Sequence, residues 1–237
     1  MVNLLYRSVT LRAALIVALQ TLGAASDSHS GRPSEPQNRG VLSIDASSDH
    51  FADIFNRSLL KQRTIRSIRA RFTETTVSSL LVKPLVAHGT VTAAYPARVS
   101  MIYTDPERKT LTMDGKTLVI AWPDRKEREQ IDIADIQKRI DQYFTTASID
   151  QLRSMFEIAV RADPAVPHTD RIDMRPRRKQ IRQGLTQLEL WIDRDSDLLT
   201  RMRLTFPDGD QKTIVLEDIT LNVPVSEEMF RGGHERP

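Results

Sequence analysis

Side chains that could perform acid–base or metal chemistry are scattered along the chain. The five histidines stand at positions 29, 50, 88, 168 and 234. No two of them have the i, i+4 spacing that lets one helix face bind a metal ion. Cysteine is absent, which excludes thiolate catalysis, disulfides and every Cys-based zinc or iron–sulfur site. The sequence therefore predicts no metal site and no cofactor.

Two acidic clusters are the remaining candidates for catalysis or ion binding. The segment Asp193–Asp197 begins like a calcium loop, but Leu198 and Leu204 occupy the places of the turn glycine and the bidentate glutamate. It therefore indicates a polar connection between two strands. Glu127 and Glu129 share a strand face beside basic residues, as solvated ion pairs do. Because no nucleophile motif, dinucleotide fingerprint or phosphate loop occurs, we expect no catalytic residue and no enzyme activity.

One stretch concentrates positive charge. Its five basic residues are Arg175, Arg177, Arg178, Lys179 and Arg182. A solvated loop is one interpretation of this basic run, and contact with anionic lipid or an acidic partner is the other. Over the whole chain, 34 Lys and Arg face 31 Asp and Glu, for a net charge of +3. This balance gives no reason to expect a nucleic-acid partner.

The first 25 residues have the pattern of an export signal. Arg7 and Arg12 precede an apolar run from Ala13 to Leu22, and the small residues Gly23 to Ala25 follow it. A charged start, a short apolar stretch and a small-residue cleavage site are typical of a secretory signal peptide. The apolar run is too short for a membrane span, which needs about 20 residues. We therefore expect cleavage near Ala25 and a location in the periplasm.

The rest of the chain is predicted to be one domain between two loose segments. Residues 26–47 are rich in Ser, Pro, Gly and other polar residues, which predicts a flexible linker. Residues 232–237 form a tail, and residues 48–231 form the domain. Hydrophobic residues make up 40% of the chain, enough for a packed core.

The domain begins with a helical period and then changes to a strand period. Phe51, Ile54 and Phe55 recur at helical spacing and predict a helix over residues 50–63, with Asp49 as its N-cap. From residue 65 the apolar positions alternate. They are Ile68, Ala70 and Phe72; Val91, Ala93 and Tyr95; Val99, Met101 and Tyr103; Leu118, Ile120 and Trp122; Leu188, Leu190 and Ile192; Met202, Leu204 and Phe206; and Ile214 and Leu216.

Turn signals separate these strands. Asp114-Gly115 predicts a two-residue hairpin turn with positive φ at both positions, and Pro207–Asp210 predicts another turn. In the last strand the apolar positions change from even to odd numbers near Glu217-Asp218. That change of phase predicts a β-bulge.

A helical block interrupts the strands. Its first helix has Ile136, Ile140, Tyr143 and Phe144 on one face, and its second has Ile149, Leu152, Met155, Phe156, Ala159 and Val160, with Ser148 and Gln151 as a capping box. These apolar stripes need a large partner, and the apolar face of the sheet supplies it. We predict an α+β fold: a strongly curved antiparallel sheet, or half-open β-barrel, with an α-helical lid. The interior is either a solid core or an apolar cavity.

A series of short motifs follows the same order as in a known family. The motifs are Ile68–Glu74, Pro84–Val91, Tyr95–Arg98, Tyr103–Pro106, Met113–Leu118, Leu188–Asp193 and Ser226–Phe230. In their order and spacing they resemble the periplasmic outer-membrane lipoprotein carrier (LolA) family, of which the chain would be a divergent member. The resemblance covers about residues 50–231.

The resemblance implies a carrier whose apolar cavity takes the acyl chains of lipoproteins or of another lipidated envelope molecule. Such a carrier receives its cargo from an inner-membrane exporter and delivers it to an outer-membrane acceptor, and we expect it to be a monomer. A non-catalytic lipid- or lipoprotein-sensing module of the same fold is the alternative. The residues expected to line the cavity are Val91, Ala93, Val99, Met101, Leu118, Ile120, Leu190, Met202 and Leu204. The expected lid residues are Ile136, Ile140, Leu152, Met155 and Phe156.

The chain departs from the family at one position. The family has an arginine just before the proline of the second strand, and this arginine helps to hold the lid. Here Tyr95 stands in that place, and Arg98 follows three residues later. Tyr95 and Arg98 are therefore candidates for contacts with the lid or the mouth of the cavity.

The export signal makes a direct prediction about the mature protein. We expect its N-terminus at or near Ser26, because the apolar run ends in the small residues Gly23 to Ala25. Intact-mass analysis of the protein recovered from the periplasm checks this. A mass that retains Met1 would contradict it and indicate a membrane-anchored form.

Overall fold

The computed structural model describes residues 46–95, 98–140 and 148–230, without the side chains of residues 46–49, 136, 139 and 140. The expected signal peptide, the linker up to residue 45 and the tail lie outside this description. In the described part of the chain, no helix has the length and apolar character needed to cross a bilayer.

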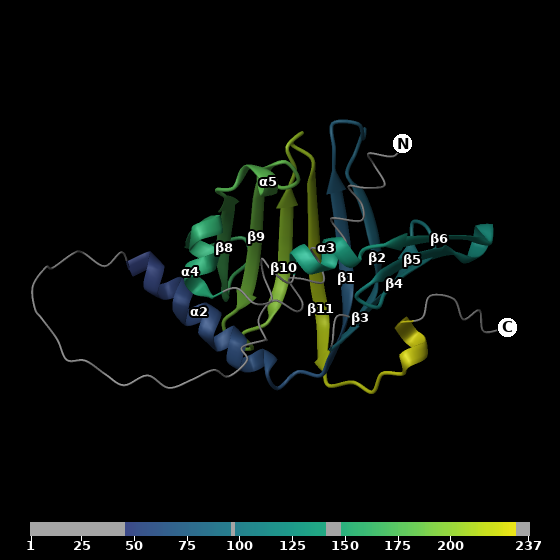
Figure 1. Ribbon diagram of the computed structural model, residues 1–237, viewed down its shortest axis with the longest axis horizontal. Helices are drawn as coiled ribbons and strands as arrows, with labels where there is room; N and C mark the ends of the chain where they lie inside the picture. The colour runs from purple at the N-terminus through teal and green to yellow at the C-terminus, as the bar shows by residue number, and fades with distance from the viewer. Residues whose placement is uncertain (1–45, 96–97, 141–147, 231–237) are drawn as a thin grey trace, which may run out of the picture.

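Helices and strands follow the chain in a helix-first order (Figure 1). The helices are α2 (Ala46–Gln62), α3 (Ala134–Ile140), α4 (Ile149–Met155) and α5 (Lys179–Arg182), with the 3-10 helices η1 (Pro123–Arg125) and η3 (Glu227–Phe230). The strands are β1 (Ser67–Val77), β2 (Leu85–Ala94), β3 (Arg98–Asp105), β4 (Lys109–Met113), β5 (Thr117–Trp122), β6 (Glu127–Asp132), β7 (Phe156–Ala162), β8 (Thr169–Pro176), β9 (Gln187–Asp193), β10 (Leu199–Thr205) and β11 (Gln211–Leu221).

All eleven strands join one antiparallel sheet in the order β6-β5-β4-β3-β2-β1-β11-β10-β9-β8-β7. Ten pairings make up the sheet, and nine of them join strands that follow one another in sequence. The exception is β1 with β11. This pairing connects the meander β1–β6 to the meander β7–β11, so that the first and last strands lie at the centre of the sheet.

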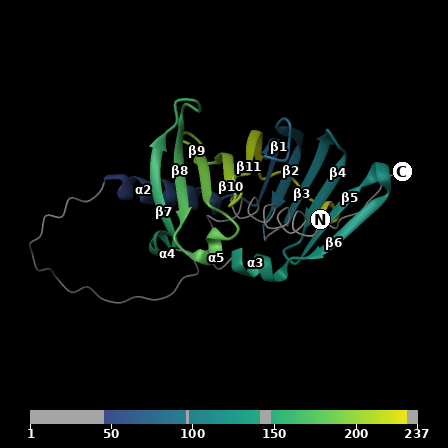
Figure 2. The same ribbon diagram turned by 90° about the horizontal axis from the view of Figure 1, so that it is seen from above.

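The sheet is strongly curved and open. Seen from above, its strands follow an arch whose ends are β7 and β6, and α3 and α4 lie on the concave side (Figure 2). Among the described residues β6 and β7 do not pair with each other, so the sheet is not a closed barrel. This confirms the predicted α+β class and the curved, half-open sheet.

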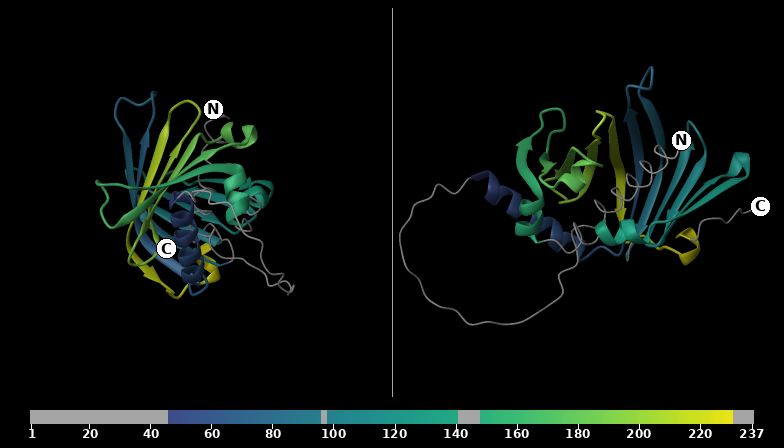
Figure 3. Two further views of the ribbon diagram at one scale, coloured as in Figure 1. Left: turned by 90° about the vertical axis from the view of Figure 1, so that its left-hand side faces the viewer. Right: turned by 45° about the horizontal axis from the view of Figure 1, so that its top comes forward.

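The hydrophobic core lies on the concave side of the arch. Alternate residues of the strands face it, as the strand period requires. They pack together with Phe51 and Ile54 of α2 and with Leu152 and Met155 of α4. Figure 3 shows α2 beside the half of the sheet that contains β7 to β10. The predicted amphipathic helix is therefore confirmed, although it begins at Ala46, before the expected N-cap Asp49.

The predicted bulge in the last strand is present. Arg69 pairs with Thr220 and Arg71 with Glu217, so β11 has one more residue than β1 between these pairs. Asp218 lies in the bulge and has a positive φ of 52°. Its carboxylate accepts a hydrogen bond from Arg71 Nε at 2.5 Å. The bulge explains why the inward positions of β11 change from even to odd numbers.

The helical block differs from the prediction at its C-terminal end. The capping box of Ser148 and Gln151 is present and starts α4, but the helix ends at Met155 and Phe156 begins strand β7. Ile158 and Val160 favour a strand because β-branched side chains pack well on a pleated surface. The expected lid helix over residues 156–160 is therefore wrong.

The hairpin at Asp114 is confirmed, but its turn is displaced by one residue. Asp114 N donates to Thr117 O at 3.3 Å, so the two central residues are Gly115 and Lys116. Of these only Gly115 has a positive φ, 89°. The carboxylate of Asp114 accepts hydrogen bonds from the backbone N–H groups of Lys116 and Thr117, which keeps the aspartate in front of the turn rather than inside it.

The register of β2 and β3 shifts between His88 and Gly89. Gly89 allows a test of how closely the strands approach there. A Cβ at Gly89 would lie 2.1 Å from Ile102 O and 2.8 Å from the ring of Phe72. We expect Gly89→Ala to lower the free energy of unfolding by about 3 kcal/mol, as overpacking does. Urea unfolding measures it. Gly184→Ala is the control, since its nearest atom is at 3.9 Å and its effect should stay within about 0.5 kcal/mol. Equal effects would contradict the close approach.

Candidate functional site

The nine predicted lining residues all lie on the apolar side of the sheet. Eight of them are at most 4% exposed, and Leu190 is half-buried against the same core. Strand register connects them into rows: Met101 stands between Val91 and Leu111, and Leu190 stands opposite Met202. The structure therefore brings these residues together on one face. That this face opens into a cavity stays a prediction.

Two of the five predicted lid residues lie on a helix over this face. Leu152 and Met155 of α4 are buried in the core. Phe156 is fully buried as well, but as the first residue of β7. The side chains of Ile136 and Ile140 lie outside the described part of α3, so their role stays a prediction.

Methionine is concentrated in this interior. Five of the seven methionines of the chain belong to the buried core, namely Met101, Met113, Met155, Met174 and Met202. Methionine is unbranched and polarisable, so it can fill spaces of varying shape. The interior therefore combines an apolar character with side chains that can rearrange.

A polar group interrupts the apolar face near the centre of the sheet. Lys212 Nζ lies 2.7 Å from Glu74 Oε1, and both side chains are only 12% exposed. Tyr103 Oη donates to Glu74 Oε2 at 3.0 Å, and Lys109 Nζ lies 4.5 Å from the centre of the Tyr103 ring. The carboxylate of Glu74 is thus held between a cation and a phenol. In the sequence, Glu74 and Lys212 are charges at inward positions of alternating strands, which is the pattern expected of a buried ion pair.

Ser58 adds a second polar group to the interior. It follows Ile54 by one helical turn on the inward face of α2 and is 1% exposed. Within the described part of the chain its Oγ has no hydrogen-bond partner. An unsatisfied buried hydroxyl costs about 1–3 kcal/mol of stability.

The opposite face of the sheet holds a structural polar cluster around Trp191. The indole is fully buried beneath the guanidinium groups of Arg171, Arg201 and Arg203, which lie 5.4–5.8 Å from its ring. Its N–H donates to Asp163 at 2.8 Å. This hydrogen bond is the main reason why the pKa of Asp163 is lowered. Arg171 also contacts Asp173 and Glu189, and Arg203 contacts Glu189. These contacts join β8, β9 and β10, which gives the cluster a structural role.

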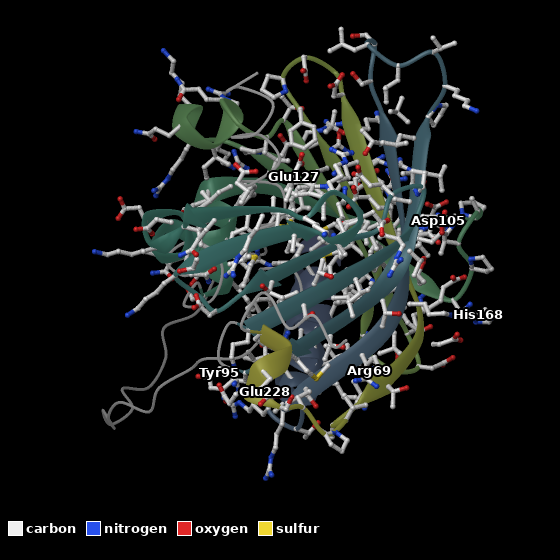
Figure 4. The ribbon with its side chains drawn as sticks, turned by 90° about the vertical axis from the view of Figure 1, so that its right-hand side faces the viewer. Arg69, Tyr95, Asp105, Glu127, His168 and Glu228 are labelled. Carbon is white, nitrogen blue, oxygen red and sulfur yellow. The ribbon has the colours of Figure 1, made fainter. Side chains whose placement is uncertain are left out.

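Tyr95 and Arg98 lie where η3 packs against the sheet. The Arg98 guanidinium forms an ion pair with Glu227 and lies 5.2 Å from the ring of Phe230. Tyr95 is 68% exposed, and Figure 4 shows it near Glu228 at this end of the molecule. Arg98 therefore holds the C-terminal 3-10 helix. A contact of either residue with the lid stays a prediction.

The remaining acid–base groups form separate pairs rather than one cluster: His88 Nδ1 lies 2.8 Å from Asp105 Oδ2, and His50 Nε2 lies 3.5 Å from Asp170 Oδ1. Figure 4 shows Asp105, Glu127 and His168 at separate places, and no group of three metal-binding side chains occurs in the described residues. The segment that begins at Asp193 is a polar β9–β10 connection, as predicted. Ser196 donates to the Asp193 carboxylate from both Oγ and N, and the Oγ bond is the main cause of the lowered pKa of Asp193.

A small cleft lies at the end of the sheet near η3. Its volume is about 400 Å³, and its lining includes Thr64, Arg66 and Asn222. The side chain of Asn222 bridges two backbone groups here, accepting from Arg66 N and donating to Thr64 O. The Asn222 and Ser67 side chains of this cleft join the start of β1 to the segment that follows β11, a structural role, and the apolar concave face is the candidate site.

The buried ion pair allows a test of the polar group. We expect Lys212→Met to lower the free energy of unfolding by about 3 kcal/mol, because it leaves the Glu74 carboxylate buried without its cation. Adding Glu74→Gln should restore much of this loss. Urea unfolding measures both, with the exposed Lys116→Met as control. A loss no larger than that of the control would show that the pair contributes nothing to stability.

Comparison with known proteins identifies a family for most of the chain. Residues 63–232 match the family model described as outer membrane lipoprotein carrier protein LolA. A search among curated proteins finds no significant match. An uncharacterized conserved protein from Thermus thermophilus has a similar solved structure, with 10% identity, a TM-score of 0.51 and coverage of 78% of this chain and 95% of that chain.

Two further solved structures are less similar. The lipoprotein LppX of Mycobacterium tuberculosis is 14% identical, with a TM-score of 0.47 and coverage of 75% of this chain and 98% of that chain. The MucA/MucB complex of Pseudomonas aeruginosa gives 17% identity, a TM-score of 0.43 and coverage of 77% of this chain and 60% of that chain. The family match spans well over half of the sequence and agrees with the order of motifs described above. The chain belongs to the outer membrane lipoprotein carrier protein LolA family.

Proposed function

We propose that this protein binds the acyl chains of a lipoprotein, or of another lipidated envelope molecule, against its concave face and carries them through the periplasm. The observation that supports this most directly is the apolar, methionine-rich concave face of an open sheet in a chain of this family. Binding and release without chemical change agree with the family description.

The energetics of an acyl chain explain why a carrier must enclose it. Burying about 15 methylenes stabilises the bound state by roughly 12 kcal/mol, at about 0.8 kcal/mol for each methylene. Free in water, such a chain would aggregate or return to a bilayer. The cargo therefore travels inside the protein, and its entry and exit require part of the covering structure to move.

The helices on the concave side are the elements proposed to move. α4 covers the face with Leu152 and Met155, and the Arg153 guanidinium lies 6.0 Å from the ring of Phe51 on α2. Such helix–sheet and helix–helix contacts can separate without breaking strand pairs.

The proposed route runs from an inner-membrane exporter to an outer-membrane acceptor, with the carrier as a monomer. Native mass spectrometry of the protein from a periplasmic extract tests cargo binding directly. Co-purifying lipid or acylated peptide supports the proposal. Protein that is recovered without any bound molecule, from cells with intact lipoprotein synthesis, would contradict it.

Met101→Trp separates a cavity from a solid core. Met101 is buried on the concave face, and its neighbour Ile102 is 48% exposed on the opposite face. In a cavity the larger ring should displace the acyl chain, so that uptake of a fluorescent fatty-acid probe falls at least about tenfold while the melting temperature changes little. In a solid core, overpacking would cost about 1–3 kcal/mol.

Ile102→Trp is the matched control and should change neither measurement, because the ring extends into solvent. A large loss of stability in Met101→Trp with unchanged probe uptake would contradict the proposal that acyl chains bind on the concave face.

A further inference from the structure

Exposed apolar side chains gather on the hairpin between β1 and β2. Nine large apolar residues are exposed in the described part of the chain, and six of them lie in this hairpin: Val77, Leu80, Leu81, Val82, Leu85 and Val86. At its tip Leu80 is 81% exposed and Val82 is fully exposed. Exposed apolar clusters of this kind mark interaction sites in soluble proteins. These six residues are called the apolar tip below.

The apolar tip is an ordered turn with apolar side chains on both of its faces. Ser78 O accepts from Leu81 N at 3.0 Å, and Ser78 Oγ accepts from Leu80 N at 3.2 Å. Consecutive strand residues point to opposite faces of a sheet, so Leu85 and Val86 point in opposite directions. A strand that docks on a protein groove needs an apolar surface on one face only. A tip that is apolar on every side suits a non-directional apolar medium.

The basic run lies at the same end of the sheet as the apolar tip. Strand pairing places the end of β1 level with the start of β9. Val77 pairs with Gln211, Gln211 with Thr205, and Thr205 with Gln187. Gln187 begins β9, directly after the connection that contains α5 and four residues of the basic run, and Arg175 lies near the end of β8. Figures 1 and 3 show α5 and the β1–β2 hairpin at this common end.

The charges of this end are largely free to meet an external anion. All five side chains of the basic run are exposed, and none of them forms an ion pair with another described residue. Lys83 lies in the same hairpin as the apolar tip. The acidic residues nearby are Asp208 and Asp210 in the β10–β11 turn and Glu157, which stands opposite Arg175. Positive charge therefore outnumbers negative charge around the apolar tip and the basic run.

We propose that this end of the molecule docks on an anionic lipid bilayer, with the apolar tip in the interfacial layer and the basic run on the lipid headgroups. Apolar insertion and attraction to anionic lipid strengthen each other at a membrane surface. An acidic protein would satisfy the basic run but would leave the tip exposed on at least one face. The proposal concerns the outer rim of the protein and does not require a cavity on the concave face.

Co-sedimentation with lipid vesicles tests this proposal. The purified protein should bind vesicles of phosphatidylglycerol and phosphatidylethanolamine at low salt, and bind phosphatidylcholine vesicles more weakly. Leu80→Asp with Val82→Asp should lower the vesicle partition coefficient at least about tenfold on both lipids, because it removes apolar insertion. Arg177→Ser with Arg178→Ser and Lys179→Ser should lower it about tenfold on anionic vesicles only. That difference should disappear in high salt.

Matched controls place the same changes at the opposite end of the molecule. Leu60→Asp alters another exposed apolar residue, 62% exposed on α2, and a Lys61→Ser, Arg63→Ser and Arg66→Ser variant removes three positive charges. Neither control should change vesicle binding. Circular dichroism checks that every variant is folded.

Uptake of the fatty-acid probe, measured on the same variants, separates this proposal from the proposed function. We expect it to remain unchanged when vesicle binding is lost. No vesicle binding by the unaltered protein, or undiminished binding by the Leu80 and Val82 variant, would overturn the docking proposal. Binding of an acidic polypeptide in place of vesicles would overturn it as well.

Discussion

One long-range strand pairing holds the two halves of the molecule together. Every other pairing in the described sheet joins strands adjacent in sequence, whereas β1 and β11 are separated by most of the chain. Polar contacts reinforce this pairing along its length: Glu74 binds Lys212, Arg71 binds Asp218, and the backbone N–H of Asn222 donates to Ser67 O. Without the pairing, two separate meanders would each lack a partner for an apolar face. The curved sheet and its core therefore depend on it.

The open edges of the sheet determine where a lid can lie. Since β6 and β7 form opposite edges of the described sheet, the chain must cross from Asp132 to Phe156, and α3 and α4 lie in this connection. Backbone hydrogen bonds fix its two ends: Ile133 N donates to Lys116 O, and Arg177 N donates to Met155 O. A short helix held by side-chain packing can open locally at a lower free energy than a sheet held by strand pairing, which is what the proposed movement of α4 requires.

Alternating apolar residues predict most of the sheet. Local periodicity does not contain the strand preference of single residues or the contacts between distant strands. The predicted helix over residues 156–160 is wrong because Val160 also continues the helical spacing of the preceding residues. Spacing alone does not show that the β-branched residues of this segment prefer a strand. The β8 strand is not predicted, although Arg171, Asp173 and Arg175 alternate with Ile172 and Met174, because only two apolar positions mark this alternation. The pairing of Glu74 with Lys212 depends on tertiary contact across 138 residues.

The cost of an empty interior explains why methionines would suit a carrier. Empty space inside a protein costs about 24 cal/mol for each Å³, so a void of about 300 Å³, a small ligand pocket, would cost about 7 kcal/mol. Whole domains are stable by only about 5–15 kcal/mol. A carrier must therefore fill its interior when no cargo is bound. Met101, Met113 and Met202, each 1% exposed, can fill that space and then yield it, because an unbranched side chain changes rotamer without moving the strand that holds it.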